Sequence, residues 1–233
     1  MAVHTHPCAS GEALAEALAA DITQRLRGAV MARGQAVLAV SGGKSPIALF
    51  TALRSADLPW AQVTVTLVDE RVVPSDHVDS NARLVREHLL QDRAQAAPFV
   101  PLVDATGDLP PTPQLLRQAQ ARWAPLPHAD VVVLGMGEDG HTASLFPEAT
   151  ALAAGLSRDN TQRLLAVQPL KAAHTRLSMS LNEILAARSV LLSLGGAAKH
   201  AVYRQASVAA DVRWPISFVL NATHPDVHVW TQP

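Results

Sequence analysis

The first part of the chain has a helical spacing of apolar residues. Between Ser10 and Gly34, apolar residues recur every three to four positions, and this spacing places them on one face of an α-helix. Serine and glycine are typical residues at the start and just past the end of a helix. The apolar face consists of Leu14, Leu18, Ile22, Leu26 and Val30. We therefore expect a long amphipathic helix that Ser10 caps and Gly34 ends.

Beyond this segment, short apolar runs alternate with helical patterns. The runs 35–40, 63–68, 130–135 and 189–194 are rich in Val and Leu, as parallel strands buried on both faces are. Shorter apolar runs lie at 98–102, 163–167, 176–181, 216–220 and 227–230, and helical patterns lie at 46–56, 81–91, 114–123, 181–187 and 195–206. This alternation predicts an α/β protein in which helices sandwich a mostly parallel sheet.

The strand ends are the places where this pattern predicts a ligand. In open α/β sheets, ligands bind beyond the carboxyl ends of the strands. Those ends follow Val40, Val68, Leu134 and Leu194. The sequence contains no internal repeat and no long low-complexity linker. We expect one domain over residues 1–233, with room for a small lobe.

Composition narrows the class of protein. Hydrophobic residues make up 48% and charged residues 17% of the chain, and the net charge is −1. These values suit a compact globular protein and give no bulk attraction for nucleic acid or an anionic membrane. Cys8 is the single cysteine, which excludes an internal disulfide. The N-terminus lacks a signal-peptide pattern, so we expect a soluble cytoplasmic protein.

The first strand end carries the sequence "SGGKSP", residues 41–46. Paired glycines let the backbone approach a ligand closely, and Ser45 followed by Pro46 is a good cap and first residue of a helix whose N–H groups attract anions. The segment lacks the nucleotide-binding patterns G-x-x-x-x-G-K-[ST] and G-x-G-x-x-G. Two interpretations stay open: a phosphate cradle or a tight strand-to-helix turn.

The second strand end carries "DERVVPSDHVDSN", residues 69–81. Arg71 can bind a phosphate or carboxylate through paired hydrogen bonds. Asp76, His77 and Asp79 have the side chains of metal ligands, but such spacing in a loop is more typical of turns and caps. We therefore expect no metal site there, and we expect Asp79 or Ser80 to cap the following helix.

The third strand end carries "GMGEDGHTASLFP", residues 135–147. Asp139 and His141 lie two residues apart in a glycine-flanked turn. A histidine held by a carboxylate can take up and return a proton near neutral pH. The alternative is that His141 only caps the next helix. Zinc is less favoured, because no second histidine lies at ligand spacing.

The fourth strand end carries "GGAAKHAV", residues 195–202, where Lys199 falls in the first turns of a helix. It can meet an anion that faces the helix N-terminus, or it can be an ordinary exposed lysine. Taken together, the strand ends bring one histidine–acid pair and several cations to the same edge of the sheet. This combination predicts an enzyme that transfers protons on a small phosphorylated molecule.

These motifs resemble those of the 6-phosphogluconolactonases. "SGGKSP", "DERVVPSDHVDSN", "GMGEDGHTASLFP" and "LLSLGGAAK" occur in that family's order and at similar spacings over nearly the whole chain. The resemblance implies a modified Rossmann-like fold, related to the sugar-phosphate isomerases and deaminases. It also implies hydrolysis of 6-phospho-D-glucono-1,5-lactone in the oxidative pentose phosphate pathway, without a cofactor.

The resemblance also implies roles for individual residues. His141 would transfer the proton and Asp139 would be its partner. The phosphorylated lactone would be bound by Ser41, Gly42, Gly43, Lys44, Asp69, Arg71, Arg176 and Lys199. Many family members have Ser where this chain has Lys44, so whether Lys44 contacts the phosphate stays open. Glu138 receives no role.

Two other functions are alternatives to lactone hydrolysis. The glucosamine-6-phosphate deaminases share the "GEDGH" turn but resemble "GHIAFNEP" after it, with a carboxylate five residues beyond the histidine. Phe146 occupies that position here, which favours the lactonase. A sugar-phosphate-binding regulatory module would be expected to have lost the Asp139–His141 turn, which this chain retains.

Overall fold

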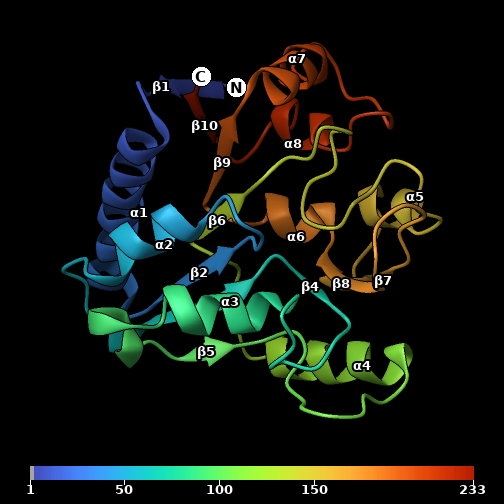
Figure 1. The fold of residues 1–233 in the computed structure, drawn as a ribbon, viewed down its shortest axis with the longest axis horizontal. Helices are drawn as coiled ribbons and strands as arrows, with labels where there is room; N and C mark the ends of the chain where they lie inside the picture. The colour runs from blue at the N-terminus through green and yellow to red at the C-terminus, as the bar shows by residue number, and fades with distance from the viewer. Residues whose placement is uncertain (1–2) are drawn as a thin grey trace.

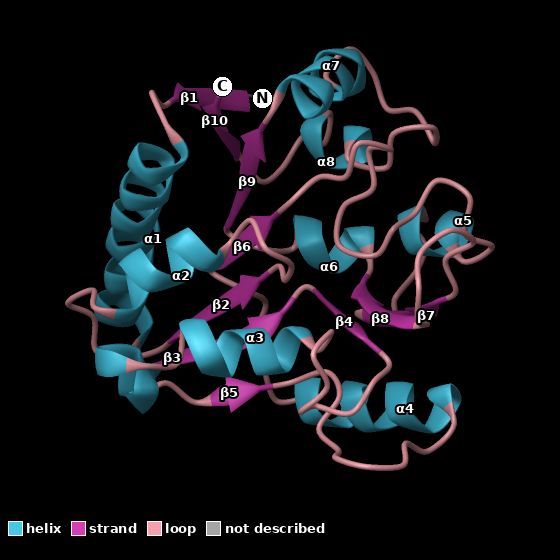
Figure 2. Ribbon diagram, viewed as in Figure 1, coloured by secondary structure: helices cyan, strands magenta, loops and turns pink. Residues whose placement is uncertain are grey.

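A large parallel sheet forms the centre of the protein. The computed structural model describes residues 3–233, and every neighbouring pair of strands in this sheet is parallel. Its seven strands lie in the order β1 (Val3–Pro7), β10 (Val227–Gln232), β9 (Ser189–Gly195), β6 (Val131–Leu134), β2 (Ala36–Val40), β3 (Val63–Leu67) and β5 (Phe99–Val100) (Figures 1 and 2). The predicted α/β fold with a mostly parallel sheet is confirmed.

A second, smaller sheet lies beside the first. It is antiparallel and contains β4 (Asp69–Arg71), β8 (Arg176–Met179) and β7 (Leu164–Val167) in that order (Figure 2). The apolar runs predict β7 and β8, whereas the sequence pattern predicts no strand at β4. Its three residues are all charged, so no apolar pattern marks it. Pairing with β8 makes it a strand.

The predicted helices occur in the expected order, most of them with shifted ends, whereas no helix was predicted at Leu152–Leu156, and the apolar run 216–220 forms a further helix. The helices are α1 (Gly11–Arg33), α2 (Ile47–Arg54), α3 (Asn81–His88), α4 (Thr112–Trp123), α5 (Leu152–Leu156), α6 (Leu181–Leu185), α7 (Ala197–Ala206) and α8 (Ser217–Leu220), with short 3₁₀ helices at Trp60–Gln62 and Asp92–Ala96. The Ser10 hydroxyl accepts a hydrogen bond from Ala13 N, and Gly34 ends α1 at φ 76°. Both predicted caps of α1 are confirmed. No helix of residues 3–233 is long and apolar enough to cross a membrane.

Several predicted ends were wrong by a few residues. Ser45 does not cap α2, because the chain makes a further turn and the helix begins after Pro46 without a side-chain cap. Helix α4 begins at Thr112 rather than Gln114, and α3 ends at His88 rather than near Gln91. Of the two residues proposed to cap α3, Ser80 is the cap, and its hydroxyl accepts from Arg83 N.

Strand β1 at the edge of the large sheet was not expected from the sequence. Its alternating His and Thr residues do not form an apolar run. It pairs with β10 at the other end of the chain, so the two termini lie together (Figure 1). The His6 ring stacks on Trp230 with ring centroids 4.3 Å apart, and His4 stacks on His228 at 4.8 Å. Cross-strand ring packing of this kind favours strand pairing.

The connections between the central strands produce a crevice. From β2 the chain continues outward to β3 and β5, whereas β6, β9 and β10 lie on the other side of β2. The direction of the connections therefore reverses between β2 and β6. At such a switch point the loops that follow two neighbouring parallel strands run apart, and ligands bind between them. The β2 and β6 strands are fully buried, so the two loops start from fixed positions.

Glu70 joins the small sheet to α3. It is completely buried, and its carboxylate accepts hydrogen bonds from the backbone N–H groups of Arg71, Asn81 and Ala82 at 2.6–2.8 Å. The Ser80 hydroxyl donates to it at 3.1 Å. Burial raises the pKa of Glu70 to about 7, against the lowering effect of these backbone donors. Glu70 therefore fixes the start of α3 against β4.

We predict that Glu70 gives the stability of the protein a specific pH dependence. A carboxyl whose pKa is raised on folding stabilises the folded state fully below about pH 4.5, and this contribution is lost as pH rises through about 7. At about 1.4 kcal/mol per pKa unit the change is up to about 3 kcal/mol. Glu70→Gln stays neutral and lacks this contribution. Denaturant unfolding from pH 4 to 8 should show the wild-type free energy of unfolding falling relative to that of Glu70→Gln; parallel profiles would contradict the prediction.

Candidate active site

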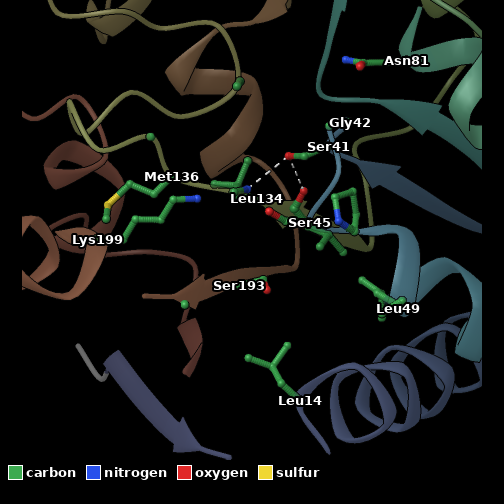
Figure 3. Close-up of a pocket in the computed structure, with 18 of the residues that line it drawn as sticks. Leu14, Ser41, Gly42, Ser45, Leu49, Asn81, Leu134, Met136, Ser193 and Lys199 are labelled. Carbon is green, nitrogen blue, oxygen red and sulfur yellow. Dashed lines mark hydrogen bonds between the residues drawn. The ribbon is translucent and has the colours of Figure 1, made fainter. Parts of the chain in front are cut away.

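A cavity of about 500 Å³ lies at the carboxyl ends of the central strands. It is lined by residues at the ends of β2, β6 and β9 and by residues of β4, α1, α2, α3 and α7 (Figure 3). Of the residues predicted to bind substrate or transfer protons, it is lined by Ser41, Gly42, Gly43, Asp69, Arg71, His141 and Lys199. The structure thus brings residues from all four predicted strand ends to one cavity.

Ser41 joins the two loops that separate at the switch point. Its hydroxyl donates to Val133 O at 2.9 Å and accepts from Gly135 N at 3.2 Å (Figure 3). Its backbone N–H also donates to Val133 O. The Ser41 side chain therefore connects the β2 loop to the β6 loop, in addition to lining the cavity.

Gly42 allows a polar side chain to approach the β2 loop. A Cβ atom at Gly42 would lie 1.9 Å from Asn81 Oδ1, so no larger residue fits while Asn81 keeps its position. The Asn81 amide donates to Asp69 O at 2.9 Å. Asn81 begins α3 and lines the cavity (Figure 3). It was predicted only as the first residue of a helix.

The alternation of β4 explains which acidic residue faces the cavity. Successive side chains of a strand point to opposite faces. Asp69 and Arg71 line the cavity, whereas Glu70 is buried against α3. The Ser144 hydroxyl donates to Asp69 Oδ2 at 2.6 Å and so fixes the Asp69 carboxylate. Ser144 was missed in the sequence, because its partner lies 75 positions away in the chain.

Two arginines lie side by side at the end of the small sheet. Arg71 on β4 and Arg176 on β8 are directly opposite in register. Arg71 donates to Asp79 O. Arg176 is only 7% exposed, and its Nε and Nη1 atoms have no hydrogen-bond partner among residues 3–233. Burial and the neighbouring Arg71 lower the pKa of Arg176. Paired guanidinium groups with unused donors suit an anion.

His141 is held by its own turn. Its Nδ1 atom lies 2.5 Å from Asp139 Oδ1, and the same oxygen accepts from His141 N at 3.1 Å. A Cβ atom at Gly137 would lie 2.2 Å from His141 Nδ1, so the turn requires glycine there. Partial burial alone would raise the pKa of Asp139, but its hydrogen bond with His141 and the histidine charge lower it overall. Asp139 is thus ionised at neutral pH beside the ring.

The remaining ring nitrogen of His141, Nε2, makes no hydrogen bond within the described part of the chain. Because His141 lines the cavity, this nitrogen is available to a molecule bound there. A histidine with a carboxylate on one nitrogen and a free second nitrogen is a standard arrangement for proton transfer.

Lys199 reaches the cavity from the opposite side of β6. It lies in the first turn of α7, and Figure 3 shows its side chain beside Met136 with the amine directed into the cavity. Lys44 behaves differently. It is exposed and does not line the cavity, although its neighbours Gly42 and Gly43 do.

The loop after β4 makes contacts within itself and with the loop that contains His174. Asp79 pairs with His174 at 3.1 Å and lies 3.8 Å from His77, and the rings of His77 and His174 meet edge to face. Within residues 3–233, no three His, Cys, Asp or Glu side chains are arranged to hold a metal ion. The Asp79–His174 pair connects this loop to the loop that precedes β8.

Comparison with known proteins identifies the family. The family model described as glucosamine-6-phosphate isomerases/6-phosphogluconolactonase matches residues 9–230. A 6-phosphogluconolactonase of Neisseria meningitidis serogroup A is 43% identical over 219 residues, which cover 93% of each chain. One from Pseudomonas putida is 44% identical over 91% of this chain and 86% of its own.

Solved structures agree with these matches. The crystal structure of a 6-phosphogluconolactonase from Shewanella baltica superposes with a TM-score of 0.94 at 39% identity, covering 100% of this chain and 98% of that chain. The motifs that suggested the resemblance therefore lie within a similarity that spans the whole fold. The chain belongs to the family of glucosamine-6-phosphate isomerases and 6-phosphogluconolactonases, and it is an enzyme of the lactonase group.

Proposed function

We propose that this enzyme hydrolyses 6-phospho-D-glucono-1,5-lactone to 6-phospho-D-gluconate, with His141 as the proton-transfer residue. The observation that carries the proposal is that His141, paired with Asp139, lines a cavity that Arg71 and Lys199 also line. The lactonases among its relatives support the substrate class.

The proposed reaction uses water and one histidine. His141 Nε2 removes a proton from a water molecule as the water oxygen attacks the lactone carbonyl carbon. The bond between that carbon and the ring oxygen then breaks, and His141 returns the proton to the departing ring oxygen. The products are a carboxylic acid, which ionises, and a free hydroxyl. General acid–base catalysis of this kind contributes roughly 10²–10⁴ in rate.

Asp139 supports both steps. Its hydrogen bond to Nδ1 fixes the ring and stabilises the imidazolium that forms during attack. The glycine-rich loop after β2 borders the cavity at Gly42 and Gly43, and its backbone N–H groups are suitable donors for the developing oxyanion. The mechanism requires no serine or cysteine nucleophile.

The cations around the cavity fit the phosphate of the substrate. Lys199 lies in the first turn of α7, where the helix dipole also favours an anion. Arg71 lines the cavity, and Arg176 beside it has unused donors. Ser41, Gly42, Gly43 and Asp69 complete the proposed substrate contacts. For Lys44 the proposal rests only on its position in the same loop, since its side chain is exposed.

Hydrolysis is favoured over the deaminase reaction by the residue next to His141. The Phe146 ring lies against the imidazole, with centroids 4.3 Å apart. A deaminase-like carboxylate at this position would give His141 a second acidic partner. Here that partner is an aromatic ring.

We further propose that residues 1–233 act as one domain in the cytoplasm, with a small phosphorylated lactone as the only ligand class. The two sheets share one cluster of buried apolar residues, and a net charge of −1 gives no bulk attraction for nucleic acid.

Replacing His141 with Ala or Gln should lower kcat by about 10²–10⁴ while the fold is retained. Acid release from freshly prepared 6-phosphogluconolactone, corrected for spontaneous hydrolysis, measures the rate. Asp139→Asn should give a smaller loss, because the ring remains but its ionic partner is gone. His88 lies on α3 outside the cavity lining and is partly buried, as His141 is, so His88→Gln provides a matched control. A wild-type kcat in folded His141→Gln would exclude the proposed role.

Replacing Arg71 or Lys199 with a neutral residue should chiefly weaken binding of the phosphorylated substrate. Loss of one charge-assisted hydrogen bond costs about 1.5–3 kcal/mol, which corresponds to roughly a 10- to 100-fold increase in KM. The comparison is with unphosphorylated gluconolactone, whose kinetic constants should change little. Equal effects on both lactones would show that these cations do not bind the phosphate.

A further inference from the structure

Phe146 covers one face of the His141 ring. Their ring planes are inclined by 32° at a centroid separation of 4.3 Å. The chain brings them together through a tight reversal, in which Leu145 N donates to Thr142 O and Ala143 adopts a φ of 48°. The reversal places a residue five positions after the histidine directly against it.

The other contacts of His141 leave the ring little freedom. Asp139 holds Nδ1, and the Gly137 backbone approaches so closely that an added Cβ would lie 2.3 Å from His141 Cε1. Phe146 therefore completes the confinement of the imidazole by its own turn and the segment after it. Productive proton transfer requires a donor or acceptor held in reach of the reacting atom, and small displacements cost large factors in rate.

We propose that Phe146 is a positioning residue for the hydrolysis: its ring fixes the His141 imidazole with Nε2 available to the cavity, and it prevents a second carboxylate from reaching the histidine. The inference rests on the proposed function, in which His141 transfers the proton. Phe146 touches the catalytic side chain and is not among the residues that line the cavity, so its effect on the reaction passes through His141.

The surrounding charges show why an acid at this position matters. The ring already has one acidic partner, Asp139. The Lys171–Glu148 pair lies on the adjoining loops. Glu148, and after it Asp139, raises the pKa of Lys171. Asp211 and Arg213 pair with each other in the loop whose Trp214 packs on Gly140. Glu138 lies on the same turn as His141, and the charged residues Asp69, Arg71 and Lys199 line the cavity. A carboxylate in place of Phe146 would favour the imidazolium and leave less free base at neutral pH.

Phe146 packs against the hydrophobic core but is less buried than its neighbour in the chain. The preceding Leu145 is 1% exposed and belongs to the hydrophobic core, whereas Phe146 is only partly buried. Leu145→Val is therefore a matched control that perturbs the core one position away and leaves the Phe146 ring in place. We expect it to lower the unfolding temperature and to leave kcat unchanged.

The test compares Phe146→Leu, Phe146→Tyr, Phe146→Gln and Phe146→Glu by kcat, KM and the pH profile of kcat/KM. We expect Phe146→Leu to lower kcat about tenfold or more with KM within twofold, since a misplaced catalytic group costs rate. Phe146→Tyr keeps the ring and should stay within about threefold of wild type. The acid limb of Phe146→Glu should lie about one pH unit above that of Phe146→Gln, which has the same shape without the charge.

The outcomes separate this inference from the proposed function. If His141→Gln loses activity but Phe146→Leu retains the wild-type kcat, or if the Glu and Gln variants have the same acid limb, the positioning role is wrong and the function stands. If His141→Gln keeps full activity, the proposed function itself fails. Circular dichroism and thermal unfolding confirm that each variant is folded, and the Tyr, Gln and Glu variants still decide the question if Phe146→Leu does not fold.

Discussion

The pairing of β2 with β6 is the constraint on which the rest of the site depends. Both strands are fully buried and parallel, so their carboxyl ends emerge side by side at fixed positions. The chain then turns to one side after β2 and to the other after β6, and the two loops separate. Ser41 hydrogen-bonds across the gap to the backbone of the β6 loop. The cavity follows from this geometry rather than from any single side chain.

The small sheet adds the cationic side of the cavity. Because β4 pairs with β8, Arg71 and Arg176 are brought opposite each other, and Glu70 on the other face of β4 binds the start of α3. That helix carries Asn81, whose side chain lies against Gly42. The two sheets are therefore joined at the site itself, through a buried carboxylate, an amide and a glycine.

Local signals made much of this predictable from the sequence. The caps of α1 and the apolar strands β2, β6 and β9 depend on neighbouring residues, and their order predicted a parallel α/β fold with sites at strand ends. Strand β1 escaped prediction because its partner lies at the other end of the chain, and β4 because its three residues are charged. The contacts of Ser144 with Asp69 and of Asn81 with Gly42 arise only from tertiary packing. Arg176 was placed by family resemblance, and its unpaired buried donors became visible only in the fold.

The most direct measurement of the central claim follows the proton on His141. The ring of His141 is titrated by NMR in the free enzyme, and its midpoint is compared with the acid limb of kcat/KM, which reports the essential groups of the free enzyme. If His141 is the base that activates water, the two midpoints coincide, and the rate falls as the ring takes up its proton. A rate that stays constant while His141 passes from neutral to charged would contradict the account.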